Sequence, residues 1–325
     1  MVVFYWMFLF CVHHLDHYPR AKEDMSPNAS LRGRDIGRDF SGKDGWSMYH
    51  GRRVPGFPRH PHRGFETITI ARQGFIDHSD STGARARFGN GDVQWMTAGR
   101  GVVHSEMFPL LQQNQANPAE LFQIWLNLPK SDKFVEPYFT MFWNDQVPVV
   151  EHLDSNARLT TVQVVAGTFN KVNAPTPPPN SWAARAQADI SILTIKMAPK
   201  AKITLPTAAA GSNRMLYLFN GWDIRIGSRT ILSGHGVQIR SDVPVLIENG
   251  EEQAELLLLQ GQPIGEPVVS YGPFVMNSRE EIQQAFADYQ RTGFGGWPWK
   301  EDAPVHAKSD QRFAIHSDGR VERRG

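Results

Sequence analysis

The chain has 325 residues, enough for two domains, and its 41% apolar and 21% charged content is typical of a globular protein with a sizeable core. Its 34 basic and 33 acidic residues give a formal charge of +1, which excludes an electrostatic case for nucleic acid or an anionic membrane as partner. The single cysteine, Cys11, excludes a disulfide within the chain.

Residues 1–24 are expected to be an N-terminal extension, either disordered or the product of a mis-called start, with the working chain beginning near Met25. Residues 1–12 are almost wholly apolar, but no basic segment precedes them and no small-residue cleavage site follows. The run is also shorter than the roughly 20 residues of a membrane span. We therefore expect no membrane attachment, and we assign His13, His14 and His17 to the tail, where they would bind metal only adventitiously.

From residue 47 to residue 165 the sequence consists of short strand-like segments separated by Gly, Asn and Asp. Residues 67–70, 92–96 and 121–128 alternate in polarity or carry β-forming side chains. Turn signals such as residues 89–92 (GNGD) fall between them. This rhythm predicts a sandwich or barrel, and we assign residues 25–165 to an N-terminal β domain.

A second β-rich stretch follows and is assigned to residues 166–270. Residues 173–181 contain four prolines, which cannot donate to a sheet, so this segment predicts a loop near the join of the two halves. The expected strands are residues 190–196, 215–220, 223–226, 237–239, 243–247 and 255–259. No sequence repeat is visible, so a duplicated architecture rests on the similar strand rhythm. The only histidine of this stretch between residues 190 and 260 is His235. Because it has no second histidine two residues away, the sequence predicts that the second domain holds no metal.

One helix is expected, Arg279–Thr292, within a C-terminal helical segment of residues 271–300. Ser278 and Glu281 fit a capping box, in which each side chain satisfies a free amide of the other residue. Gly293 suits the position after the helix end. The apolar face requires a surface to cover, so we predict a docking helix. Residues 301–325 are expected to be a tail in which His306 and His316 are solvated and residues 321–325 are frayed.

Two short motifs carry the chemistry of the first half. His60 and His62 are separated by one residue, so both imidazoles face one side of an extended strand. His104 and Glu106 repeat this spacing, and two strands crossing a barrel would bring all four side chains together. Three imidazoles and a carboxylate suit iron, manganese, nickel, copper or zinc, and disfavour calcium and magnesium. These residue types at this spacing predict one transition-metal site.

Two long motifs resemble the signatures of the pirin family, residues 60–67 (HPHRGFET) and residues 91–106 (GDVQWMTAGRGVVHSE). Residues 261–267 and 271–277, with the capped helix behind them, resemble the C-terminal segment of the family. The similarity extends from about residue 42 to residue 295. It implies an all-β fold of two cupin barrels, a bicupin, with the C-terminal helix docked on the first barrel and no metal in the second.

The resemblance also assigns the site. His60, His62, His104 and Glu106 match the four iron ligands of pirins position by position. In the wider cupin superfamily the carboxylate follows the first histidine pair, which would be Glu66. Glu66 has the right strand parity but would lie about 13 Å from His62 on a straight strand, so Glu106 is assigned and Glu66 remains the alternative.

Other residues of these motifs have structural interpretations. Gly99 and Gly101 are expected to form a tight turn that aims His104 inward. Trp95 and Met96 are expected in the barrel core. Arg63 is expected either to orient Glu106 or to form a surface salt bridge.

Four protein ligands on an octahedral metal leave two positions for exchangeable ligands, which suits oxygenase chemistry better than a structural role. The resemblance to pirins implies Fe(2+)/Fe(3+) as the cofactor, with other divalent transition metals as alternatives. Some pirins are similar to quercetin 2,3-dioxygenases in activity. A flavonol-like substrate and dioxygen would be the partners, and Glu106 the catalytic base. The alternative from a different class is a redox-sensing transcriptional co-regulator that binds a partner protein. The expected state is a cytoplasmic monomer, also nuclear in a eukaryote.

Overall fold

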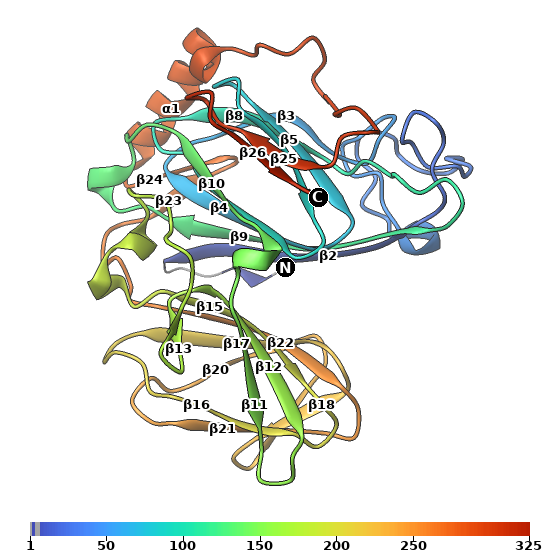
Figure 1. Cartoon of the computed structure of the whole chain (residues 1–325). Coiled ribbons are helices and arrows are strands. Elements are labelled where there is room, and N and C mark those ends of the chain that lie inside the picture. Colours follow the sequence, from blue (N-terminus) through green and yellow to red (C-terminus); the bar gives the residue numbers. More distant parts are fainter. Residues whose placement is uncertain (1, 4–6) are drawn as a thin grey trace. The chain divides into compact units, whose positions relative to one another are not determined.

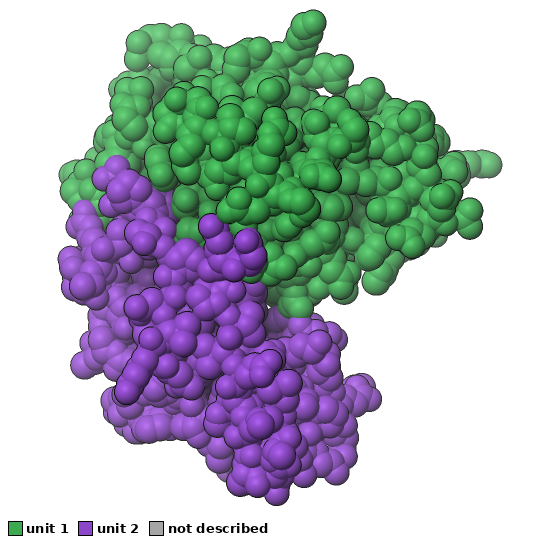
Figure 2. Space-filling view, in the orientation of Figure 1, with its two compact units in different colours: residues 1–144, 266–325 green, residues 145–265 purple. Residues whose placement is uncertain are grey.

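The computed structural model describes residues 2–3 and 7–325, so part of the apolar run, residues 1 and 4–6, lies outside the described residues. The chain forms two compact units, residues 1–144 with 266–325 and residues 145–265 (Figure 2). The division lies at residue 144 rather than at the expected residue 165. The reason is that β11 (Val149–Leu153) pairs with β12 (Leu159–Ala166), and β12 pairs with β15 (Ser191–Met197) of the second unit.

The first unit consists mainly of two six-stranded antiparallel sheets (Figure 1). The first sheet runs in the order β1 (Val2–Val3), β2 (Phe8–Tyr18), β9 (Asn117–Asn127), β4 (Phe65–Gln73), β7 (Asp92–Thr97) and β10 (Tyr138–Phe142). The second runs in the order β26 (Val321–Arg324), β25 (Arg312–Ile315), β6 (Arg85–Gly89), β5 (Phe75–Asp80), β8 (Val102–Met107) and β3 (Gly56–His62). The strands predicted at residues 67–70, 92–96 and 121–128 are confirmed in β4, β7 and β9.

The core of the first unit lies between these two sheets. Ala71 of β4 and Met96 of β7 pack in one cluster with Phe88 of β6 and Val102 of β8. Alternation along each strand explains this arrangement, because every second side chain faces the opposite sheet. The interpretation of Met96 as core is confirmed, and Trp95 is also fully buried.

Residues 8–18 differ from the expected tail, because they form strand β2 beside β9. Asp16 on this strand accepts hydrogen bonds from the Ser47 amide at 2.8 Å and from the Tyr49 hydroxyl at 2.7 Å. His13 lies 2.9 Å from Glu120, and His14 lies 2.9 Å from the Tyr49 hydroxyl. His13 and His14 therefore contact neighbouring residues of the fold and are not part of a tail.

Among the residues that the structure describes, no helix is long and apolar enough to cross a membrane.

The C-terminal part of the first unit contains helix α1 (Arg279–Thr292), the hairpin β23 (Val269–Tyr271)–β24 (Phe274–Met276) and the strands β25 and β26. The helix bounds and the capping box of Ser278 and Glu281 are confirmed. Ile282 and Ala285 of α1 pack with Phe274 and with Val103 of β8, so the predicted docking on the first barrel is also confirmed.

The prediction of a solvated, frayed tail is wrong. His306 is 8% exposed, and its Nε2 lies 3.1 Å from the carbonyls of His78 and Ala86. His316 is 6% exposed, its ring stacks on Phe139, and its Nε2 lies 2.7 Å from Glu322 Oε1. Because β25 pairs with β6, the segment extends the second sheet instead of leaving the fold.

The second unit also has two main sheets, with a core that draws on both. One runs in the order β11, β12, β15, β22 (Ala254–Gly261), β17 (Asn213–Asn220) and β20 (His235–Gln238). The other runs in the order β16 (Lys202–Leu205), β21 (Val245–Asn249), β18 (Asp223–Ile226) and β19 (Arg229–Leu232). A small hairpin joins β13 (Thr168–Phe169) and β14 (Val172–Asn173). Among the described residues, the 3₁₀ turns are Lys43–Gly45, Lys130–Asp132, Asn144–Gln146, Trp182–Ala184, Ala186–Ala188 and Gly293–Gly295.

A buried lysine ties the β24 hairpin to the first sheet. The Lys133 ammonium donates to the carbonyls of Gly64 and Val275 at 2.8 and 3.1 Å, and to Asn127 Oδ1 at 2.8 Å. Its burial lowers the pKa of Lys133 to about 7.

Lys133 should make stability rise with pH. Between pH 7 and about 10.5 the unfolded chain binds up to one more proton at this position than the folded chain, so the free energy of unfolding increases with pH in that window. We expect a gain of about 2 kcal/mol from pH 7 to pH 9, measured by urea unfolding. In Lys133→Met this part of the pH dependence should vanish. Identical slopes in the two proteins would contradict the assignment.

Candidate metal centre

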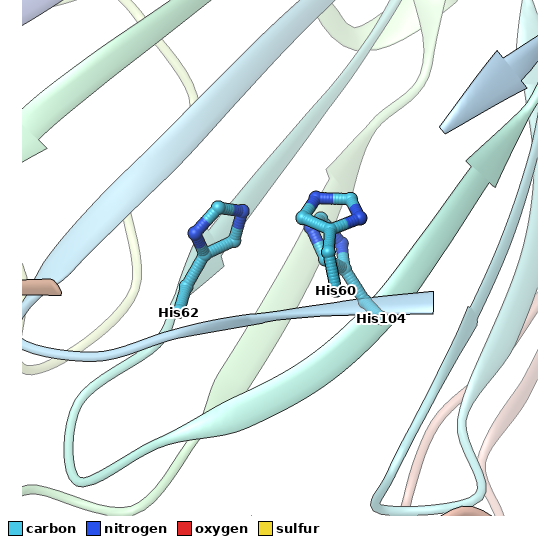
Figure 3. Close-up of side chains that lie close together, drawn as sticks. All are labelled: His60, His62 and His104. Atoms are coloured by element: carbon cyan, nitrogen blue, oxygen red, sulfur yellow. The ribbon is translucent and has the colours of Figure 1, made fainter. Parts of the chain in front are cut away.

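The three histidines of the motifs lie on two neighbouring strands. β3 and β8 pair antiparallel, and His60 is the register partner of His104. The ring centroid of His104 lies 4.4 Å from that of His60 and 4.9 Å from that of His62. One ring nitrogen from each histidine lies within 4.8 Å of the others, and Figure 3 shows the imidazoles close together on one side of the β3 ribbon. The sequence predicted two strands that cross the barrel. In the structure the two strands are instead neighbours in one sheet.

The turn before β8 sets the direction of that strand. Gly99 and Gly101 have φ values of +49° and +134°. A side chain at position 99 would place its Cβ 2.1 Å from the Val135 carbonyl, and one at position 101 would meet the Phe294 ring at 2.6 Å. Both positions therefore require glycine, which confirms the predicted tight turn.

Burial keeps the three imidazoles in the state that binds metals. It lowers the pKa of His60, and it lowers the pKa values of His62 and His104 well below the usual histidine value. Neutral rings keep a lone pair for coordination. The Nδ1 of His60 lies 2.8 Å from the Pro58 carbonyl, a contact that fixes this nitrogen as the donor and leaves Nε2 as the ligand atom.

These residues fit a transition metal. Within the described part of the chain, both ring nitrogens of His104 and the Nδ1 of His62 are buried without a hydrogen-bond partner. Buried polar atoms are nearly always satisfied, and unpaired ones call for an explanation such as an ion. Imidazole nitrogens with a nearby carboxylate suit iron, manganese, nickel, copper and zinc.

Glu106 lies next to this cluster without joining its compact core. Its Oε2 is 3.8 Å from His104 Nε2. Thr69 donates to Oε1 at 3.3 Å, and Gln123 donates to Oε2 at 2.8 Å. The carboxylate is thus held at the edge of the cluster by two side chains of the other sheet.

Glu66 lies on β4, three residues from Thr69. Side chains three apart on a strand point to opposite faces, so Glu66 faces away from the side on which Thr69 contacts Glu106. Its Oε1 accepts a hydrogen bond from the Thr97 hydroxyl at 2.7 Å. This geometry favours Glu106 over Glu66 as the carboxylate of the site.

Sequence reasoning missed a fourth imidazole. His78 on β5 is the register partner of Glu106, is fully buried, and has its ring centroid 5.4 Å from that of His104. Its Nε2 lies 3.1 Å from Asp80 Oδ2. The signal was the same alternate spacing, since His78 and Asp80 are also two residues apart.

Of the two roles expected for Arg63, the contacts support a salt bridge rather than the orientation of Glu106. Arg63 Nη1 donates to Asp288 Oδ2 of α1 at 2.8 Å, and its Nε donates to the Arg100 carbonyl. The hydrogen bond from Arg63, with those from Arg291 and Gln284, lowers the pKa of Asp288 to about 2. Arg63 is only 6% exposed, so the salt bridge is real but buried, and it holds the helix against the turn before β8.

The chain has two antiparallel β units, and the first gathers buried imidazoles on adjacent strands. These features define a two-barrel protein with a candidate metal centre in its first barrel. The Pirin family model matches residues 32–126, and the model of the Pirin C-terminal cupin domain matches residues 192–295. The chain belongs to the pirin family. The predicted all-β fold of two cupin domains is thereby confirmed.

Several known proteins are similar to the chain. A Pseudomonas aeruginosa protein named "Putative quercetin 2,3-dioxygenase" is 33% identical over 256 residues, covering 79% of this chain and 84% of the relative. Human Pirin is 34% identical over 257 residues, covering 76% and 80%. The solved structure of quercetin 2,3-dioxygenase from Acinetobacter baumannii aligns with a TM-score of 0.70 and 28% identity, covering 89% of this chain and 86% of that one.

Proposed function

We propose that this protein is an iron-dependent dioxygenase of the quercetinase type, which opens the ring of a flavonol with dioxygen and releases carbon monoxide. One observation carries the proposal. His60 belongs to the imidazole cluster and also lines a cavity of about 670 Å³, so a small molecule can reach the metal ligands. A structural zinc site would be closed by its four protein ligands. The names of the relatives supply the reaction class.

The residues around the cluster have defined tasks in this reaction. Bound iron would supply Lewis acidity toward a chelating flavonol oxygen and redox reactivity toward dioxygen. Glu106 takes the proton of the flavonol 3-hydroxyl as general base. Thr69 and Gln123 hold its two oxygens and orient it toward the cluster. The rings of Phe65 and Trp125 lie 5.1 and 5.5 Å from the His62 ring and shield that side of the site from water.

Oxygen uptake tests the proposal. The protein loaded with ferrous iron should consume dioxygen in proportion to the quercetin lost. Glu106→Gln should reduce kcat roughly 100-fold or more, because the amide cannot accept the proton. A variant of a carboxylate outside the cluster, Glu255→Gln, should match the wild type. Full turnover in Glu106→Gln would remove the base from the mechanism, and no uptake by an iron-loaded wild type would overturn the oxygenase.

The competing function is a redox-sensing co-regulator that uses a basic surface beside the site. The contacts do not favour it. Arg87 is fully buried against Asp77, and Arg53 and Arg59 are paired with Glu301 and Asp302. One tightly held iron without oxygen uptake would shift the assignment to this class.

A further inference from the structure

The cavity at His60 has one wall that the family matches do not include. Both matches end by residue 295, and residues 296–325 lie beyond them. Within this extension, Glu301, Asp302 and Ala303 line the cavity that His60 also lines. The extension is built into the fold, since β25 pairs with β6 of the second sheet. It therefore contributes to the entrance of the candidate metal centre as a fixed element.

Two ion pairs join this wall to the opposite rim. The Arg59 amide donates to the Asp302 carbonyl at 2.7 Å, and Arg59 Nε lies 3.3 Å from Asp302 Oδ1. Arg53 Nη2 lies 3.7 Å from Glu301 Oε2. The acidic side chains of the extension thus neutralise two of the three arginines that line the cavity.

The third arginine, Arg52, keeps its charge available. Among the residues that the structure describes, it forms no ion pair, and its guanidinium lies over Gly37, 3.7 Å from where a Cβ would stand. An exposed guanidinium at the edge of a cavity matches the fork geometry of a carboxylate.

Three rings line the cavity, those of His50, Phe57 and His60. The Phe57 ring lies edge-on to His60 with centroids 6.4 Å apart, and edge-on to His50 with centroids 5.8 Å apart. Such faces suit a planar aromatic molecule. A ligand that reaches His60 through this cavity would therefore pass aromatic rings and meet one uncompensated positive charge.

We propose that the C-terminal extension is a selectivity element that, by neutralising Arg53 and Arg59, leaves Arg52 to select aromatic substrates bearing one carboxylate. This inference rests on the proposed function only in taking the His60 cavity as the place where substrate binds. The selectivity itself is a property of binding and does not depend on turnover. Glu301 and Asp302 limit the number of anionic groups that the entrance accepts, and Arg52 pairs with the single carboxylate.

Anaerobic binding measurements test this selectivity without turnover. The iron-loaded protein is titrated with 3-hydroxyflavone and with its 4′-carboxylate, and Kd is measured by tryptophan fluorescence. We expect the carboxylate to bind roughly fivefold to tenfold more tightly, and this preference to shrink as salt rises. Arg52→Gln should remove the preference by weakening the binding of the carboxylate. The matched control, Arg279→Gln, changes an exposed arginine at the start of α1 and should keep the preference.

A double variant tests the extension itself. Glu301→Gln with Asp302→Asn frees Arg53 and Arg59, so a flavonol with two carboxylates should gain roughly fivefold or more in affinity. Equal Kd values for the two ligands in the wild type, or a preference that survives Arg52→Gln, would overturn the inference. Selective binding with no oxygen uptake would overturn the dioxygenase alone, and quercetin turnover without charge preference would overturn the selectivity alone.

Discussion

Replacement of His104 by alanine is expected to abolish tight metal binding, with a loss of affinity greater than about 100-fold. His104 is the register partner of His60, and both of its ring nitrogens are buried without a hydrogen-bond partner within the described chain. Removing it leaves His60 and His62 on one strand with Glu106 at the edge of the cluster, so the site loses one of its three clustered imidazoles. Metal content after ferrous loading and gel filtration, measured by mass spectrometry, checks the result.

The matched control is His235→Ala, because His235 is an exposed histidine in a strand of the second unit. It should retain one metal per chain. The His104→Ala protein should remain folded, since the lost ring makes no hydrogen bond, and its thermal transition should lie close to that of the metal-free wild type. An unchanged metal content in a folded His104→Ala protein would contradict the assigned site.

The second large effect concerns stability. Arg87→Met should lower the free energy of unfolding by about 3–5 kcal/mol, because it leaves the Asp77 carboxylate buried without a counter-charge. Arg87 donates to both oxygens of Asp77 at 2.7 Å, and both side chains are fully buried. It also donates to the carbonyls of His306, Ala307 and Asp310. Urea unfolding measures the loss, and limited proteolysis should show earlier cleavage in residues 303–311.

Arg85→Met is the control for this change, because Arg85 lies on the same strand but is exposed. It should alter stability by no more than about 0.5 kcal/mol. The double variant Asp77→Asn with Arg87→Met should lose less than Arg87→Met alone, since no charge remains buried. Equal stability of Arg87→Met and wild type would show that the ion pair does not anchor the C-terminal extension.

The sequence determined the parts of this protein that depend on local patterns. Alternating polarity and β-forming side chains predicted β4, β7 and β9. Ser278 and Glu281 predicted the start of α1, and Gly293 predicted its end. The spacing of His60, His62 and His104 predicted their convergence. Each of these features needs only the two-residue period of a strand, the hydrogen-bonding needs of a helix end, or the backbone freedom of glycine.

Only the tertiary structure decided which segments lie next to one another. Residues 8–18 resembled a tail because their apolar run has no clear alternation, yet β9 offers an edge that they cover. His306 and His316 resembled solvated residues because no local pattern records the burial that β5, β6 and β10 impose. The position of Glu106 beside His104, and the presence of Glu301 and Asp302 at the His60 cavity, arise from sheet pairing between distant segments. Such contacts are set by the energy of burying whole elements together, which a short stretch of sequence does not encode.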